Sequence, residues 1–154
     1  MSSIHHTYIF ESGMWEKIGE SFVNKTQQTY PLKETVLCER NARCWRVVSE
    51  KTILRNPPLH STQHLDMQQD AKMHTWATWS LEHPRFGKMR GSFTVFETGI
   101  ISRWSSEKGF SSYAVLTKVN ETTYKENGFS FTPGEKVFEQ WTAEVKKLGI
   151  STGR

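Results

Sequence analysis

The sequence predicts an all-β fold, an antiparallel up-and-down β-barrel of about 8–10 strands, from the spacing of its turns, the shortness of its connections and its aromatic content. Turn signals recur roughly every ten residues, as in barrels and sandwiches. The clearest connections have two or three residues, too few for a parallel crossover. Nine Phe, six Trp and four Tyr favour strands over helices. A chain of 154 residues suits a single domain over residues 1–154, and we expect residues 1–7 and 149–154 to be frayed.

The central and C-terminal parts of the chain are divided by turn residues. Asn127-Gly128 predicts a type I′ hairpin, because both residues tolerate positive φ. Thr98-Gly99 and residues 107–109 predict two further hairpins, and residues 70–72 predict a fourth turn. The segments between these turns alternate with a period of two. Apolar side chains occur on both faces of several segments, so the pattern does not tell the inner face from the outer one.

Two end segments fit either a strand or a helix. Residues 13–24 carry Met14, Ile18 and Phe22 at helical spacing but also alternate as a strand would. Residues 135–148 offer the same two interpretations, so a short terminal helix stays open. We favour strands for both, and closure into a barrel depends on their pairing as strands.

Charge and cysteine content exclude some classes of protein. The net charge is +4, but Lys and Arg are spread along the chain and interleaved with Glu, so no nucleic-acid partner is predicted. Apolar runs are only a few residues long, so no membrane span is predicted. The N-terminus lacks a signal peptide, and we therefore expect a cytoplasmic protein in which Cys38 and Cys44 are free thiols.

Several stretches resemble lipocalin-type barrels, the calycins. Gly13-Met14-Trp15 with Gly19 is similar to their first strand. Residues 73–148 are similar to a group of uncharacterised bacterial lipocalin-like proteins, through residues 86–93, 100–102, 123–124, 127–129 and 141–147.

The resemblance implies capture of a small, mostly apolar molecule in the barrel mouth. It also implies that Trp15 packs at the closed end of the barrel beneath a basic side chain of the last strand, Lys146 or Lys147, in a cation–π contact.

Motifs for chemistry are weak. His60 and His64 are four apart and His74 follows, but the alternation there indicates a strand, and no metal site is predicted. No nucleophile motif, dinucleotide fingerprint or phosphate-binding loop occurs, so neither a catalytic residue nor a cofactor is predicted.

Tryptophans near arginines are the most informative side chains. Trp76 and Trp79 lie three apart, so one should point into the barrel and the other outward. An inner ring beside an inner arginine would suit an amphipathic anion. The predicted ligand wall is Trp45, Trp76, Phe93 and Trp104, with Arg46 and Arg103 as anion partners. For each ring, simple filling of the core stays open as the alternative.

The predicted function is therefore non-enzymatic binding of a small apolar or amphipathic molecule inside a β-barrel. Two alternatives stay open: a small barrel enzyme of the lyase or isomerase type acting on a hydrophobic substrate, and a protein-interaction module anchored by an exposed tryptophan.

Overall fold

The computed structural model describes residues 5–69, 72 and 75–149, and these residues form eleven strands and no helix. The strands are β1 Gly13–Val23, β2 Gln28–Arg40, β3 Trp45–Ile53, β4 Leu59–Asp66, β5 Gln68–Gln69, β6 Trp76–His83, β7 Gly87–Phe96, β8 Gly99–Ser106, β9 Ser111–Asn120, β10 Thr123–Phe131 and β11 Val137–Lys147. The all-β prediction is confirmed, with one strand more than the upper number expected. Both ambiguous end segments are strands, β1 and β11.

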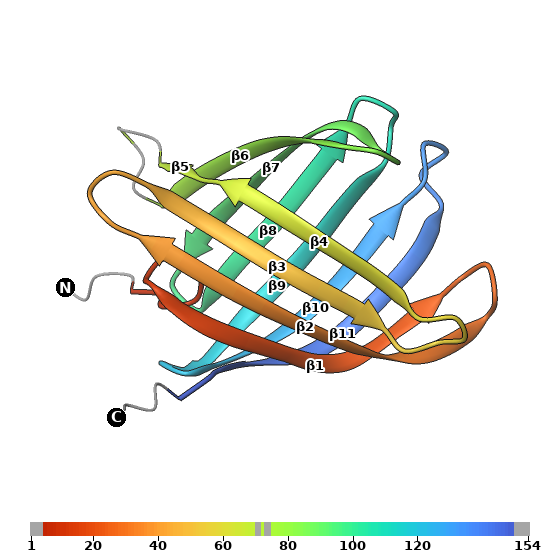
Figure 1. Cartoon of the computed structure of the whole chain (residues 1–154), viewed down its shortest axis with the longest axis horizontal. Coiled ribbons are helices and arrows are strands. Elements are labelled where there is room, and N and C mark those ends of the chain that lie inside the picture. Colours follow the sequence, from red (N-terminus) through yellow and green to blue (C-terminus); the bar gives the residue numbers. More distant parts are fainter. Residues whose placement is uncertain (1–4, 70–71, 73–74, 150–154) are drawn as a thin grey trace.

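All the strands belong to one antiparallel sheet that curls into a nearly closed barrel (Figure 1). Successive strands pair from β1 to β4 and from β5 to β11, and β1 pairs with β11, with Gly19 opposite Ala143. In Figure 1, β3 and β4 cross in front of β8 and β9. The two edges of the sheet are β4 and the short β5, and β4 contacts β6 without a ladder between them. The sheet order thus leaves the two edge strands as the seam of the barrel.

The inner face is defined by one row of alternate residues on each strand. Ala77 and Trp79 on β6, and Met89 and Phe93 on β7, are buried in the core. The intervening residues point outward and are half-buried, like Thr78 and Ser92, or exposed, like Arg90. Both faces carry apolar groups in the sequence, but only the inner row meets the opposite wall of the barrel.

The segment before β1 turns into one end of the barrel and closes it. Tyr8 and Ile9 are buried, and the Ile9 carbonyl accepts a hydrogen bond from the indole nitrogen of Trp45 at 2.8 Å. His6 is also buried, and its ring bonds the Tyr124 hydroxyl and the Phe96 carbonyl, at 2.9 Å and 2.7 Å. Of the stretch expected to be frayed, residues 1–4 lie outside the described residues, whereas His6 and Thr7 belong to this plug.

The prediction of a hairpin at Asn127-Gly128 is wrong. β10 runs straight through these residues, and Gly128 stands opposite Trp141 of β11. A Cβ on Gly128 would lie 2.2 Å from the Trp141 ring, so the glycine serves to let the ring lie against the strand. The hairpins at Thr98-Gly99 and residues 107–109 are confirmed. The turn expected at 70–72 lies mostly outside the described residues.

Trp15 is fully buried at the plugged end. Its ring packs edge-on against Tyr8 and Tyr124, at centroid distances of 5.3 Å and 5.8 Å. Lys146 is exposed and pairs with Glu144, so it does not cover the ring. Lys147 is directly opposite Trp15 in the ladder between β1 and β11. Among the described residues, however, no cation–π contact joins Trp15 to a lysine, so the predicted contact is not observed. The lysine that lies over a ring at this end is Lys17, whose nitrogen is 5.3 Å from the Tyr8 centroid.

Within the described part of the chain, no helix has the length and apolarity needed to cross a membrane.

An arginine-lined trough as candidate functional site

Four charged groups inside the barrel are bonded in two pairs. Lys17 and Glu126 form an ion pair of 2.7 Å, and the Trp141 indole donates a hydrogen bond of 2.6 Å to the same carboxylate. Burial opposes the charge of Glu126, but the Lys17 ammonium and these hydrogen bonds hold its pKa below the usual value. Nearer the unplugged end, Glu139 accepts a hydrogen bond of 2.5 Å from the Ser21 hydroxyl and pairs with Lys51 at 3.5 Å. These inner charges therefore have partners without a ligand.

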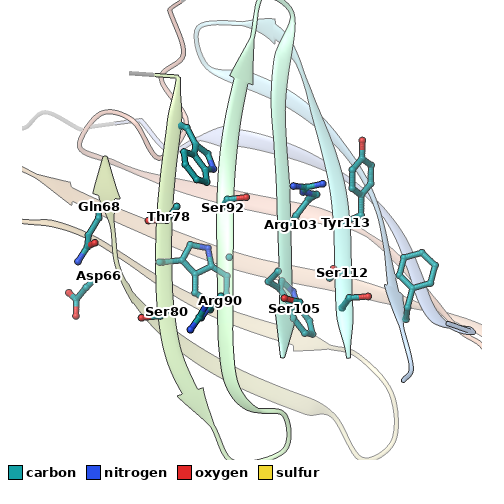
Figure 2. Close-up of a pocket in the computed structure, with 16 residues that line it drawn as sticks. Asp66, Gln68, Thr78, Ser80, Arg90, Ser92, Arg103, Ser105, Ser112 and Tyr113 are labelled. Atoms are coloured by element: carbon teal, nitrogen blue, oxygen red, sulfur yellow. The ribbon is translucent and has the colours of Figure 1, made fainter. Parts of the chain in front are cut away.

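A trough of about 640 Å³ lies on the outer face of the sheet, over β6 to β9. Figure 2 shows it from outside the barrel. Its lining combines hydroxyls, two arginines and aromatic rings: Asp66, Gln68, Trp76, Thr78, Trp79, Ser80, Arg90, Gly91, Ser92, Arg103, Trp104, Ser105, Ser111, Ser112, Tyr113 and Phe131. Trp79, Gly91, Trp104 and Ser112 belong to the inner rows of their strands.

Strand register arranges the outer side chains in rows. One row places Thr78, Ser92 and Arg103 opposite one another on β6, β7 and β8. The next row places Arg90 opposite Ser105. The short hydroxyl side chains of these rows form the floor of the trough. Longer side chains at the same positions would fill the trough. Figure 2 shows Ser92 and Arg103 at one level and Arg90 and Ser105 at the next.

Arg90 and Arg103 are diagonal neighbours on adjacent strands, with backbone positions about 7–8 Å apart. Both are exposed. Among residues 5–69, 72 and 75–149, neither guanidinium has an ion-pair or hydrogen-bond partner. Asp66, at the rim, pairs instead with Arg46 at 3.4 Å. Two uncompensated positive charges thus face a floor of hydroxyl groups, a set of donors suited to an anion.

Aromatic rings border the trough on both sides. Trp76 lies at the β6 side and is half-buried. Tyr113 lies directly opposite Arg103, on β9, and Phe131 follows on β10. The trough therefore offers apolar surface beside its charges, as an amphipathic molecule requires.

The predicted site residues are divided between the two faces of the sheet. Trp45 and Phe93 are buried in the core, and the indole nitrogen of Trp45 is bonded to the plug. Trp76 and Arg103 meet at the trough, where Trp104 contributes from the inner row. Arg46 is on the outer face of β3, bonded to Asp66. The arginines are thus not in the interior, and their role in binding stays a prediction.

Trp76 and Trp79 point to opposite faces, as their spacing requires. Trp79 is buried in the core, while Trp76 borders the outer trough. The two histidines His60 and His64 both lie on the outer face of β4, whereas His74 is outside the described residues.

Sequence reasoning missed Arg90, Tyr113 and the hydroxyl floor. A signal was present, because three successive strands carry short polar or arginine side chains at alternate positions: Thr78 and Ser80, Arg90 and Ser92, Arg103 and Ser105. An alternation of this kind marks one face of a sheet. Its meaning depends on the register that brings these positions side by side.

Comparison with known proteins places the chain in no family. No model of a known protein family and no curated protein matches it. A solved structure described as a candidate AttH from Nitrosomonas europaea is 13% identical, with a TM-score of 0.35, over 87% of this chain and 49% of that one. An N-terminal dehydratase from the difficidin assembly line is 11% identical, with a TM-score of 0.27, over 92% of this chain and 80% of that one.

This chain spans about half the length of the AttH-like structure, 49%. At these TM-scores neither likeness carries an argument about fold or function. The barrel expected from the lipocalin resemblance is present in the structure itself, whereas membership of the lipocalin family has no support from these comparisons.

Proposed function

We propose that this protein binds a small amphipathic anion without chemical conversion, in the trough over β6 to β9. The observation that carries the proposal is the diagonal pair Arg90 and Arg103, which has no acidic partner among the described residues and faces a hydroxyl floor. An anion would satisfy both guanidinium groups and accept hydrogen bonds from Ser92 and Ser105. The sequence predicts the same class of ligand inside the barrel, whereas the trough proposed here lies on the outer face of the sheet.

The interior is the less favourable place for such a ligand. The plug and the aromatic core occupy one end of the barrel, and Lys17 and Glu126 neutralise each other in the middle. A ligand there would have to displace bonded groups, and each buried group left unpaired costs about 1–3 kcal/mol. The barrel enzyme and the protein-interaction module stay predictions, since no observation favours either over anion binding.

Fluorescence titration with 8-anilinonaphthalene-1-sulfonate tests the proposal, because this probe joins apolar rings to a sulfonate. Arg90→Gln and Arg103→Gln should each weaken binding about tenfold or more, since a charge-assisted hydrogen bond contributes about 1.5–3 kcal/mol. The matched control is Arg43→Gln, in the exposed turn between β2 and β3. It removes the same charge without changing any residue that lines the trough, and it should leave the affinity unchanged.

The uncharged analogue N-phenyl-1-naphthylamine separates anion recognition from general apolar binding. We expect the wild-type protein to bind it more weakly than the sulfonate, and the arginine variants to bind both compounds alike. Equal affinity of the wild-type protein and both arginine variants for the sulfonate would refute the proposal. Native mass spectrometry of freshly purified protein can then identify the anion that the trough carries.

A further inference from the structure

An exposed aromatic surface continues from the trough across the next two strands. Tyr113 on β9 is directly opposite Arg103 on one side and Phe129 of β10 on the other. These two rings are 38% and 41% exposed, which is unusual for large apolar side chains in neighbouring positions. Phe129 also stacks on Phe131, with ring centroids 6.5 Å apart and planes inclined by 30°. A charged group and an open aromatic platform therefore share one row of the sheet.

Beyond this platform the surface is hollowed again. A second trough, of about 330 Å³, lies over β1, β2, β10 and β11, and Phe129 forms part of its wall. The row that contains Arg103, Tyr113 and Phe129 continues into this second trough through Gln140 and Phe22. Phe129 and Phe131 thus stand between two hollows, and a planar group resting on them has free space on both sides.

We propose that the ligand is an aryl anion, a planar aromatic ring carrying a carboxylate, sulfate or phosphate, with its ring seated on Tyr113 and Phe129. Its anionic group is held by Arg103 and Arg90. This inference rests on the proposed function and names the ligand class for the same site.

The spacing of the row fits such a molecule. Tyr113 is one strand from Arg103 and Phe129 is two, so the backbone distances are about 5 Å and about 10 Å. The long arginine side chain extends over part of that distance. The distance that remains matches the length of a small aromatic ester or acid. Ring-on-ring contact favours planar groups, because their faces and edges carry opposite partial charges. An aliphatic anion of the same charge obtains only the arginine contacts.

A pair of phosphate monoesters with equal charge tests the ring seat. We expect 2-naphthyl phosphate to bind the wild-type protein at least about tenfold more tightly than cyclohexyl phosphate, the factor typical of one aromatic stacking contact. Equilibrium dialysis gives both affinities. Amide chemical shifts in ¹H–¹⁵N spectra should change at Tyr113, Phe129 and Arg103 on addition of the naphthyl ester.

Variants that keep apolar bulk but remove the ring isolate stacking. Phe129→Leu and Tyr113→Leu should each reduce the preference for the naphthyl ester about threefold or more, and should leave cyclohexyl phosphate binding unchanged. The control is Val119→Ala, an exposed residue on the outer face of the same strand as Tyr113, which should leave both affinities unchanged.

The outcomes distinguish this inference from the proposed function. Equal binding of the two esters, or a preference that survives both leucine variants, overturns the ring seat; the proposed function then stands if Arg90→Gln and Arg103→Gln still weaken binding. Failure of both esters to bind, with no effect of the arginine variants on the sulfonate probe, overturns both. Comparison of 2-naphthoate and 2-naphthalenesulfonate with the phosphate then identifies which anionic group the arginines prefer.

Discussion

The Lys17 ammonium lies 2.7 Å from a carboxylate oxygen of Glu126 in the middle of the barrel, where both side chains are at most 10% exposed. The two residues belong to β1 and β10, which are separated in the sheet by β11. This ion pair therefore forms only when the last strand has joined the first. It connects the closure of the barrel to its polar interior.

Removal of one partner should destabilise the fold strongly. Glu126→Gln removes the carboxylate bonded to the buried Lys17 ammonium, and breaking a buried ion pair in this way costs about 3–5 kcal/mol. Urea unfolding measured by tryptophan fluorescence gives the free energy of unfolding. The control is Glu144→Gln, whose partner Lys146 is exposed and whose loss should cost less than about 1 kcal/mol. Equal losses in the two variants would mean that the inner pair contributes no more than a surface pair.

The same pair makes stability fall in acid. The pKa of Glu126 in the folded protein is below the ordinary value of 4.5, so the unfolded chain takes up this proton first. The stability that comes from the ionised carboxylate is complete above pH 4.5 and is lost as the pH falls through the lower, folded pKa. The difference in unfolding free energy between wild type and Glu126→Gln should therefore be constant from pH 7 to about 5 and shrink below that range. A difference that grows on acidification contradicts this assignment.

A substitution at Gly128 tests whether β10 runs straight through Asn127-Gly128 and packs closely against Trp141. In Gly128→Ala the new Cβ would lie 2.2 Å from the Trp141 ring, so the ring must move and stability should fall by about 1–3 kcal/mol. A turn glycine with open space around it, Gly134, provides the control, because its nearest neighbour atom is at 3.9 Å. Gly134→Ala should change the melting temperature little. Similar melting temperatures for the two variants would argue against the close contact with Trp141.

The two thiols should react at very different rates. Cys44 is exposed in the turn before β3, whereas Cys38 is buried and donates to the Ile9 carbonyl of the plug at 3.1 Å. Burial raises the pKa of the Cys38 thiol to about 11, which leaves almost no thiolate at neutral pH. With 5,5′-dithiobis(2-nitrobenzoate), Cys44→Ser protein should show only slow reaction, and Cys38→Ser protein only fast reaction. Fast labelling of Cys38 in folded protein would show that the plug opens readily.

Local patterns in the sequence predicted much of the fold. Alternation and turn residues located the hairpin connections from β7 to β9, because the chemistry of a short turn is contained within a few neighbouring residues. The same reasoning failed at Asn127-Gly128. A glycine suits a tight turn and a close ring contact equally, and the ring of Trp141 arrives from another strand. The candidate site was recovered only in part, through Trp76, Trp104 and Arg103, because an isolated arginine does not show which face it occupies.

By itself the sequence determined an antiparallel, aromatic-rich β domain, because side-chain alternation, β propensity and turn chemistry act over short distances along the chain. Tertiary structure decided which face is inner, the pairing of β1 with β11, the plug of Tyr8 and Ile9, and the diagonal approach of Arg90 and Arg103. Alternation with a period of two separates the two faces of a strand, but it does not show which face is buried. Burial is assigned only when the opposite wall of the barrel is present, and the trough follows from the register that this burial imposes.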